Sequence, residues 1–174
     1  EAEVLVLRGE TSQAETLLRN TIALRRRQHG ATGELAIDLL RYGRLLNQLE
    51  RPAEAWTVLR AAAPIATEYY GARSAAMLQI RVAAVETLAM GGRIRDCRAL
   101  LARISPSFSK MRQDPLLQAR YLRGRAALQL ASGNAPAAIS ELDAAEVVAR
   151  KAGRGADLFA LETAVIRKRS NAPP

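Results

Sequence analysis

Few residues of this 174-residue chain have the type or spacing that catalysis requires. The single histidine, His29, follows three arginines, a setting typical of a helix end, where cationic side chains complement the helix dipole. The single cysteine, Cys97, occupies a position at which small residues recur, which favours a packing role over the alternative nucleophilic one. Carboxylates such as Glu54, Glu141 and Asp143 are scattered, with no second group placed to divide acid and base roles.

The sequence also lacks the motifs on which common catalytic sites are built. It contains no GxxxxGKS/T, HExxH or GxSxG pattern, so P-loop phosphate binding, zinc hydrolysis and a nucleophile elbow have no starting point. One histidine and one cysteine cannot supply the three or four soft ligands of a typical zinc site. We therefore expect no enzymatic activity, no cofactor and no metal.

The composition indicates helices that pack closely. Apolar residues make up 49% of the chain and aromatic residues only 4%, so the interior must consist mainly of Ala and Leu, which are strong helix formers. No apolar run is long enough to span a bilayer, and the N-terminal Glu1-Ala2-Glu3 lacks the basic region of a signal peptide. We expect a cytoplasmic protein. Because the chain opens without Met, and inside a predicted helix, we expect it to be part of a longer protein.

The charge is strongly basic, with 26 Lys and Arg against 17 Asp and Glu and a net charge of +9. Such an excess favours an acidic partner. The alternative is that an Ala- and Arg-rich chain reflects biased codon usage and solvated helix faces.

An internal repeat with a period of 41 to 42 residues organises the sequence. Stretches beginning at Gly9, Glu50, Gly92 and Gly133 align without gaps, and each places a small residue five positions later. A leucine follows after four more residues and a further small or apolar residue after three, which is one stripe of an α-helix. The aligned positions are Ala14, Leu18 and Thr21; Ala55, Leu59 and Ala62; Cys97, Leu101 and Ile104; Ala138, Leu142 and Ala145.

Each aligned stretch is thus predicted to be the second helix of a helical hairpin. The first helices are predicted at about 33–49, 73–90 and 114–131, from apolar residues spaced by three and four. Gly30, Gly71 and Gly153 mark helix ends, and a Ser-Pro-Ser sequence predicts a long break over residues 105–113.

A turn glycine, a small residue five positions later and then a leucine together resemble the tetratricopeptide repeat (TPR), with Gly43 fitting the small residue of its first helix. The period and the run Ala-Leu-Arg-Arg-Arg-Gln-His-Gly at 23–30 are similar to the 42-residue variant of kinesin light chains and many bacterial proteins. The resemblance implies an all-α superhelical solenoid in one domain, 1–174. Its repeats would be 1–30, 31–71, 72–113 and 114–153, with a terminal helix at 155–168.

The same resemblance implies a scaffold that binds a peptide or protein on a concave face lined by the first helices. Acidic peptides or C-terminal carboxylates are the expected ligands, because guanidinium and amide groups suit them. Regulatory domains of bacterial kinases or transcriptional regulators often contain such repeats. Carrying the register back from Ala55 nominates Arg41, Arg44, Asn47, Gln48, Gln79, Glu86, Met90, Arg120 and Arg123 as partner-binding residues.

Two other functions remain open. Arg-rich helices could bind nucleic acid, although the sequence has no aromatic platform and no recognised nucleic-acid motif. Alternatively, an exposed end of the helical stack, including Val4, Leu5 and Leu7, could mediate self-association.

Overall fold

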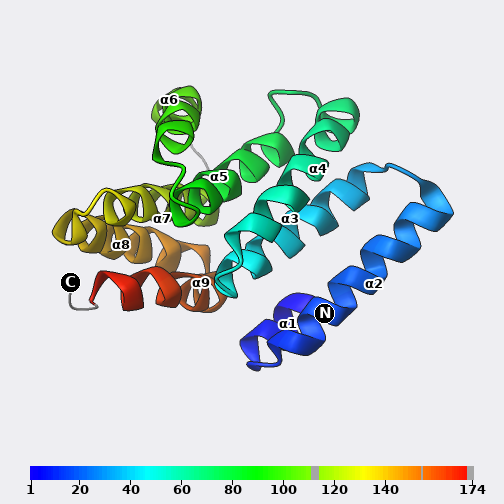
Figure 1. Cartoon of the computed structure of the whole chain (residues 1–174), viewed down its shortest axis with the longest axis horizontal. Coiled ribbons are helices and arrows are strands. Elements are labelled where there is room, and N and C mark those ends of the chain that lie inside the picture. Colours follow the sequence, from blue (N-terminus) through cyan, green and yellow to red (C-terminus); the bar gives the residue numbers. More distant parts are fainter. Residues whose placement is uncertain (111–113, 154, 172–174) are drawn as a thin grey trace. The chain divides into compact units, whose positions relative to one another are not determined.

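The computed structural model describes residues 1–110, 114–153 and 155–171, and in these residues all regular structure is helical (Figure 1). This confirms the all-α prediction. The helices are α1 (Ala2–Leu7), α2 (Thr11–His29), α3 (Gly33–Gln48), α4 (Pro52–Tyr70), α5 (Ala75–Met90), α6 (Ile94–Lys110), α7 (Pro115–Ala131), α8 (Ala135–Ala149), the 3₁₀ turn η1 (Arg150–Ala152) and α9 (Gly155–Ser170).

The chain forms two compact units, Glu1–Ala83 and Ala84–Pro174, with the boundary inside α5. In the first unit α1 packs on α2, α2 on α3, and α3 pairs closely with α4. In the second unit α7 and α8 form the closest pair, α6 packs on α7, and α9 packs on both α7 and α8. The arrangement of these hairpins as a TPR solenoid stays a prediction.

The predicted helices are confirmed to within about two residues at their ends. The first helices of three hairpins lie at Gly33–Gln48, Ala75–Met90 and Pro115–Ala131, and the predicted terminal helix is Gly155–Ser170. Side-chain caps fix several starts, because they satisfy amides that have no partner within the helix. Thr32 accepts a bond from the amide of Leu35 at 3.2 Å. Asp114 accepts one from Leu117 at 3.1 Å.

The four aligned turn positions all have a positive φ. Gly9, Gly92 and Gly133 have φ of 78°, 72° and 79°, in the left-handed region that glycine enters without a Cβ penalty. Glu50 replaces glycine in the second repeat and still has φ of 57°, the one positive value for a non-glycine among the described residues. The turn of the second repeat therefore keeps a positive φ although glutamate replaces glycine there.

The aligned small residues are fully buried in the helix packing. Ala14, Ala55, Cys97 and Ala138 are all 0% exposed. A Cβ added to Gly43 of α3 would lie 2.7 Å from Cδ2 of Leu59 in α4, so a larger residue at this position would force the two helices or the Leu59 side chain to shift. These contacts confirm the predicted packing stripe, although Leu101 and Thr21 are only half-buried.

The predicted break over 105–113 is wrong for residues 105–110, because α6 continues through Pro106 to Lys110. Residues 111–113 lie outside the described residues. Proline removes one helix amide bond but does not prevent the helix when tertiary contacts stabilise the following turn. Phe108 supplies such a contact: its ring stacks on Tyr121 of α7 with centroids 4.0 Å apart.

Candidate functional site

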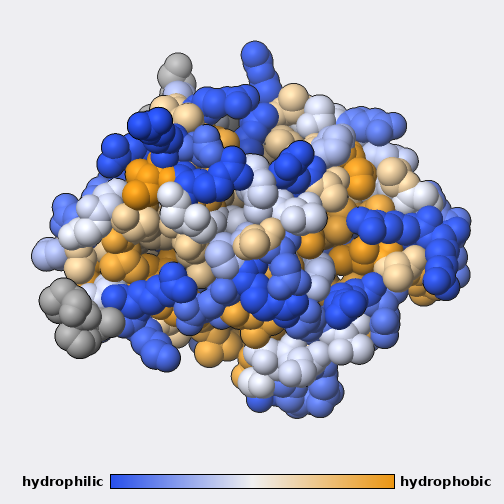
Figure 2. Space-filling view, in the orientation of Figure 1, coloured by the Kyte–Doolittle hydropathy of each residue, from blue (hydrophilic) through white to orange (hydrophobic). Residues whose placement is uncertain are grey.

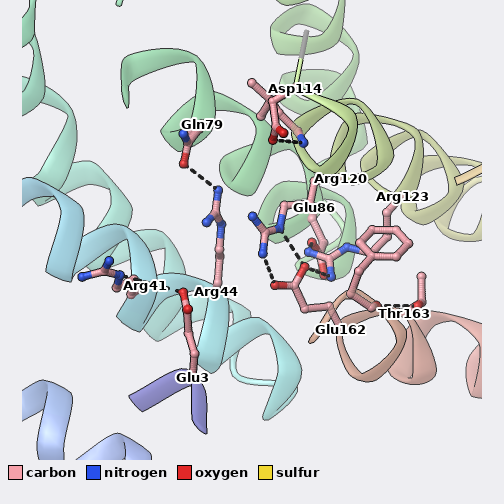
Figure 3. A network of polar contacts seen from close by, with 12 residues as sticks. Glu3, Arg41, Arg44, Gln79, Glu86, Asp114, Arg120, Arg123, Glu162 and Thr163 are labelled. Atoms are coloured by element: carbon pink, nitrogen blue, oxygen red, sulfur yellow. Dashed lines mark hydrogen bonds and ion pairs between the residues drawn. The ribbon is translucent and has the colours of Figure 1, made fainter. Parts of the chain in front are cut away.

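In the first unit, two arginines nominated from the sequence lie on α3 with partly accessible guanidinium groups. The Arg41 side chain is 48% exposed; its Nη1 lies 3.3 Å from Oδ1 of Asp38, and its Nε lies 4.0 Å from Glu3. Arg44 is half-buried and donates from Nη2 to Oε1 of Gln79 at 3.2 Å (Figure 3). This bond joins α3 to the first half of α5 and sets an amide beside a guanidinium.

The other two nominated residues of α3 differ in exposure. Gln48 is half-buried in the last turn of the helix. Asn47 is 1% exposed, and its Nδ2 lies 3.5 Å from the carbonyl oxygen of Ala83. In this structure Asn47 is therefore a buried contact to α5 and not part of an accessible surface.

The Asp38 side chain pairs with two arginines of the first unit. Its side chain is 6% exposed and lies 2.5 Å from Nε of Arg25 as well as beside Arg41. A cavity of about 250 Å³ adjoins it, lined by the first three residues, Leu17, Leu18, Thr21, Asp38 and Arg41. Sequence reasoning missed Asp38, although a carboxylate between the buried residues Leu35 and Leu39 of an apolar stripe was a usable signal.

In the second unit, three nominated residues form a buried ion-pair network with Glu162 of α9 (Figure 3). Nε and Nη2 of Arg120 donate to the two carboxylate oxygens of Glu162 at 2.9 and 2.6 Å. Nη1 of Arg123 donates to Glu162 at 2.8 Å, and its Nη2 donates to Glu86 at 2.5 Å. Two cations and two anions thus pair within the interior.

The four side chains are well shielded from water. Arg120 is 8% exposed, and the other three residues are 2 to 3% exposed. Arg123 also lies with its Cζ 5.7 Å from the ring centroid of Phe159, and its Nε has no hydrogen-bond partner. Burial raises the pKa of Glu86, since desolvation disfavours the carboxylate, while the nearby Arg123 opposes that rise.

This network changes the interpretation of Glu86, Arg120 and Arg123. They were nominated as partner-binding residues, but their charged groups are buried and bound to one another through α5, α7 and α9. We therefore assign these three residues a structural role in this arrangement.

Met90, the last nominated residue, is half-buried at the end of α5 and lines a second cavity of about 350 Å³. The cavity lies within the second unit, between the C-terminal turns of α5, α7 and α9. Its lining is mostly apolar, and Arg169 is its one charged residue.

Residues considered for catalysis take structural positions. His29 is the last residue of α2 and is exposed. Cys97 is 0% exposed, its Sγ donates to the carbonyl oxygen of Val85 at 3.3 Å, and burial raises its pKa to about 11. A thiol with such a pKa holds little of the nucleophilic thiolate at neutral pH. In the described part of the chain, no three His, Cys, Asp or Glu side chains are grouped so that they could hold a metal ion.

A search of the described residues for helices that could cross a membrane finds none of sufficient length and apolar character. Comparison of the chain with protein-family models, with curated proteins and with solved structures gives no significant match.

Proposed function

We propose that this chain is a non-catalytic protein-interaction module of the TPR type, in which the α3 and α5 side chains of the first unit bind a carboxylate-bearing peptide or partner. Arg41, Arg44, Gln48 and Gln79 are the proposed contacts. The parent protein would be a cytoplasmic scaffold or regulator, and the hairpins would form a superhelix of the kind described for this repeat.

The observation that supports this proposal is the arrangement of donors on α3. Arg41 and Arg44 are three residues apart and therefore lie on neighbouring parts of one helix face. The bond from Arg44 to Gln79 holds the Arg44 guanidinium in place, while Arg41 keeps 48% of its side chain exposed. Guanidinium groups bind carboxylates through paired, charge-assisted hydrogen bonds, so this face suits an acidic ligand.

Internal carboxylates do not saturate Arg41. Its contacts with Asp38 and Glu3 are at 3.3 and 4.0 Å, and half-exposed pairs of this kind contribute about 1 kcal/mol or less. An incoming carboxylate can therefore replace them at small cost. Asp38 itself stays paired with Arg25 at 2.5 Å, so the site would not be left with an unpaired buried anion.

The test reverses both charges, with Arg41→Glu and Arg44→Glu in one chain. A C-terminal peptide library first supplies an acidic ligand of the unmodified protein, and calorimetry then compares the variants. Loss of a charge-assisted bond costs about 1.5 to 3 kcal/mol, so affinity should fall at least about tenfold. Arg26→Glu with Arg27→Glu is the matched control, since it reverses two charges at exposed positions of α2 that are not among the proposed contacts. Equal loss in both double variants, or none in either, would refute the assignment.

Nucleic-acid binding is a second candidate, favoured by the distribution of charge. Residues 84–174 contain fifteen basic and eight acidic residues, a net charge of +7, whereas residues 1–83 carry only +2. Arg95, Arg98 and Arg103 are exposed on α6. Figure 2 also shows extensive hydrophilic surface on the face in view. A salt titration separates the two candidates, because counterion release makes nucleic-acid affinity fall by orders of magnitude over moderate salt.

A further inference from the structure

The outward face of α9 carries an ordered set of side chains that neither the ion-pair network nor the α3 face uses. The other face of α9 packs on α7 and α8 within the second unit and is buried (Figure 1). The outward face is exposed and includes Asp157, Leu161, Ala164 and Lys168. These residues follow one another at spacings of four, three and four, which places them on a single stripe of the helix. We call these four residues the α9 outer stripe.

The middle of the α9 outer stripe is apolar. Leu161 is 42% exposed and is one of the large apolar side chains that remain open to water. Ala164 follows it on the stripe, and the exposed Ala160 lies beside it. Alanine allows another helix to approach closely, at an interaxial distance of about 8 to 10 Å. A helix laid along the stripe would therefore cover the Leu161 side chain.

The two ends of the α9 outer stripe carry opposite charges. Asp157 belongs to the first turn of α9 and Lys168 to its last turn. The ion pairs between described residues of the second unit involve neither of these two side chains. At 1.5 Å per residue, they lie about 16 Å apart along the helix. Each end is thus available to a charge of opposite sign.

The α9 outer stripe is complementary to itself. Asp157 precedes Leu161 by four residues, and Lys168 follows Ala164 by the same number. A second copy in the antiparallel direction therefore places Asp157 opposite Lys168 and Leu161 opposite Ala164, and each of these pairs occurs twice. Such self-complementarity is the requirement for a twofold dimer interface. A parallel copy would place like charges opposite each other, and a partner with charges of only one sign would meet repulsion at one end.

We propose that two copies of this chain associate through their α9 outer stripes, antiparallel about a twofold axis. The Asp157 carboxylate of each copy pairs with the Lys168 ammonium of the other, and Leu161 packs on Ala164 across the axis. A single helix face buries less area than the roughly 1,200 to 2,000 Å² of stable complexes, so the association is reversible and needs high protein concentration. This inference goes beyond peptide binding on α3 and does not depend on it.

Sedimentation equilibrium of the full chain, from about 20 μM to 1 mM, measures the association. A salt concentration of about 0.1 M screens the general repulsion between basic chains more than it screens close ion pairs. The variants are Asp157→Lys, Lys168→Asp and the double variant that combines them. Leu161→Gln tests the apolar centre. Lys151→Asp is the matched control, because it makes the same charge change as Lys168→Asp at an exposed position outside α9.

We expect each single charge reversal to weaken the dimer at least about tenfold, because it replaces two attractive pairs with two repulsive ones. The double variant should dimerise as the unmodified chain does, since exchange of the two charges restores both pairs. For the same reason, an equimolar mixture of the Asp157→Lys and Lys168→Asp chains should form a heterodimer. Leu161→Gln should weaken association, and the control should change it less than twofold. Thermal melts verify that each variant is folded.

Four results would overturn the proposal: an unmodified chain that stays monomeric throughout the range, single reversals that dimerise normally, a double variant that does not recover, or a mixture that forms no heterodimer. Association that survives both reversals but is lost in Leu7→Gln would place self-association at α1 instead. Failure here is separate from failure of the proposed function, because Arg41 and Arg44 belong to the first unit and their variants leave the α9 outer stripe unchanged.

Discussion

Removal of the charge of Glu162 should destabilise the protein far more than loss of a surface ion pair. Glu162→Gln keeps the size and one carbonyl oxygen but removes the anion that receives three bonds from Arg120 and Arg123. Two guanidiniums would then share the interior with Glu86 alone. Breaking a buried ion pair by removing one partner costs about 3 to 5 kcal/mol, because an uncompensated buried charge remains.

The expected shift in melting temperature follows from chain length. For proteins of 150 to 250 residues, 1 kcal/mol corresponds to about 2 to 4 °C, so a loss of 3 kcal/mol lowers Tm by at least about 6 °C. Asp96→Asn is the matched control, since its pair with Arg93 has side chains 54% and 45% exposed. Exposed pairs contribute at most about 1 kcal/mol, so the control should shift Tm by no more than about 4 °C.

A fourfold variant distinguishes two causes of the stability loss, an unpaired buried charge and lost packing. Arg120→Leu, Arg123→Met, Glu86→Leu and Glu162→Leu together replace all four charged side chains with apolar side chains of roughly similar volume. Apolar replacements of complete buried ion-pair networks are often neutral or stabilising. Thermal melts by circular dichroism, supported by urea titration, measure all variants. If Glu162→Gln melts like Asp96→Asn, the buried-network argument is refuted.

The other predictions concern two aligned positions of the repeat, Glu50 and Cys97. Glu50→Gly should stabilise the protein by about 0.5 kcal/mol. Glycine removes the strain of the left-handed backbone at φ 57°, but it also loses more backbone entropy on folding, so the two effects partly cancel. A lower Tm than that of the unmodified chain would contradict this prediction. Cys97 should resist thiol reagents until the protein unfolds, because it is buried and its pKa is raised to about 11 from the ordinary value of 9.0. The unfolded thiol loses its proton first, so stability should fall as pH rises from about 9 to 11, and Cys97→Ala should remove that fall. An equal fall in the alanine variant, measured by urea titration at each pH, would exclude the thiol as its source.

The backbone pattern of this chain could be predicted from sequence because it depends on local and repeated constraints. A turn residue in the left-handed region and a small residue five positions later recur with a period of 41 to 42, so one repeat supports the interpretation of the next. The segment 105–110 was misassigned for the opposite reason. Pro106 is a local signal for a break, whereas the stacking of Phe108 on Tyr121 is a tertiary contact that no local pattern contains.

Side-chain burial on the first helices was less predictable than the helices themselves. The register placed Arg41, Arg44, Arg120 and Arg123 in one class of polar, partner-facing positions. The structure divides that class, because Arg41 is 48% exposed whereas Arg120 and Arg123 are 8% and 2% exposed. The difference comes from Glu162, which lies 42 and 39 residues further along the chain, in a helix outside the aligned repeats.

One local feature of the sequence indicates that Glu162 pairs with a cation in the interior. Glu162, Thr163 and Ile166 follow Phe159 by three, four and seven residues, which places all four on one face of α9, and all four are buried. A carboxylate on an apolar stripe needs a cation, because an unpaired buried charge is very costly. The sequence offers many arginines but does not identify which one approaches. Only the packing of α9 on α7 selects Arg120 and Arg123. A repeat can therefore predict where a polar side chain lies on its helix, while the neighbouring helix decides whether that side chain binds a partner or stabilises the interior.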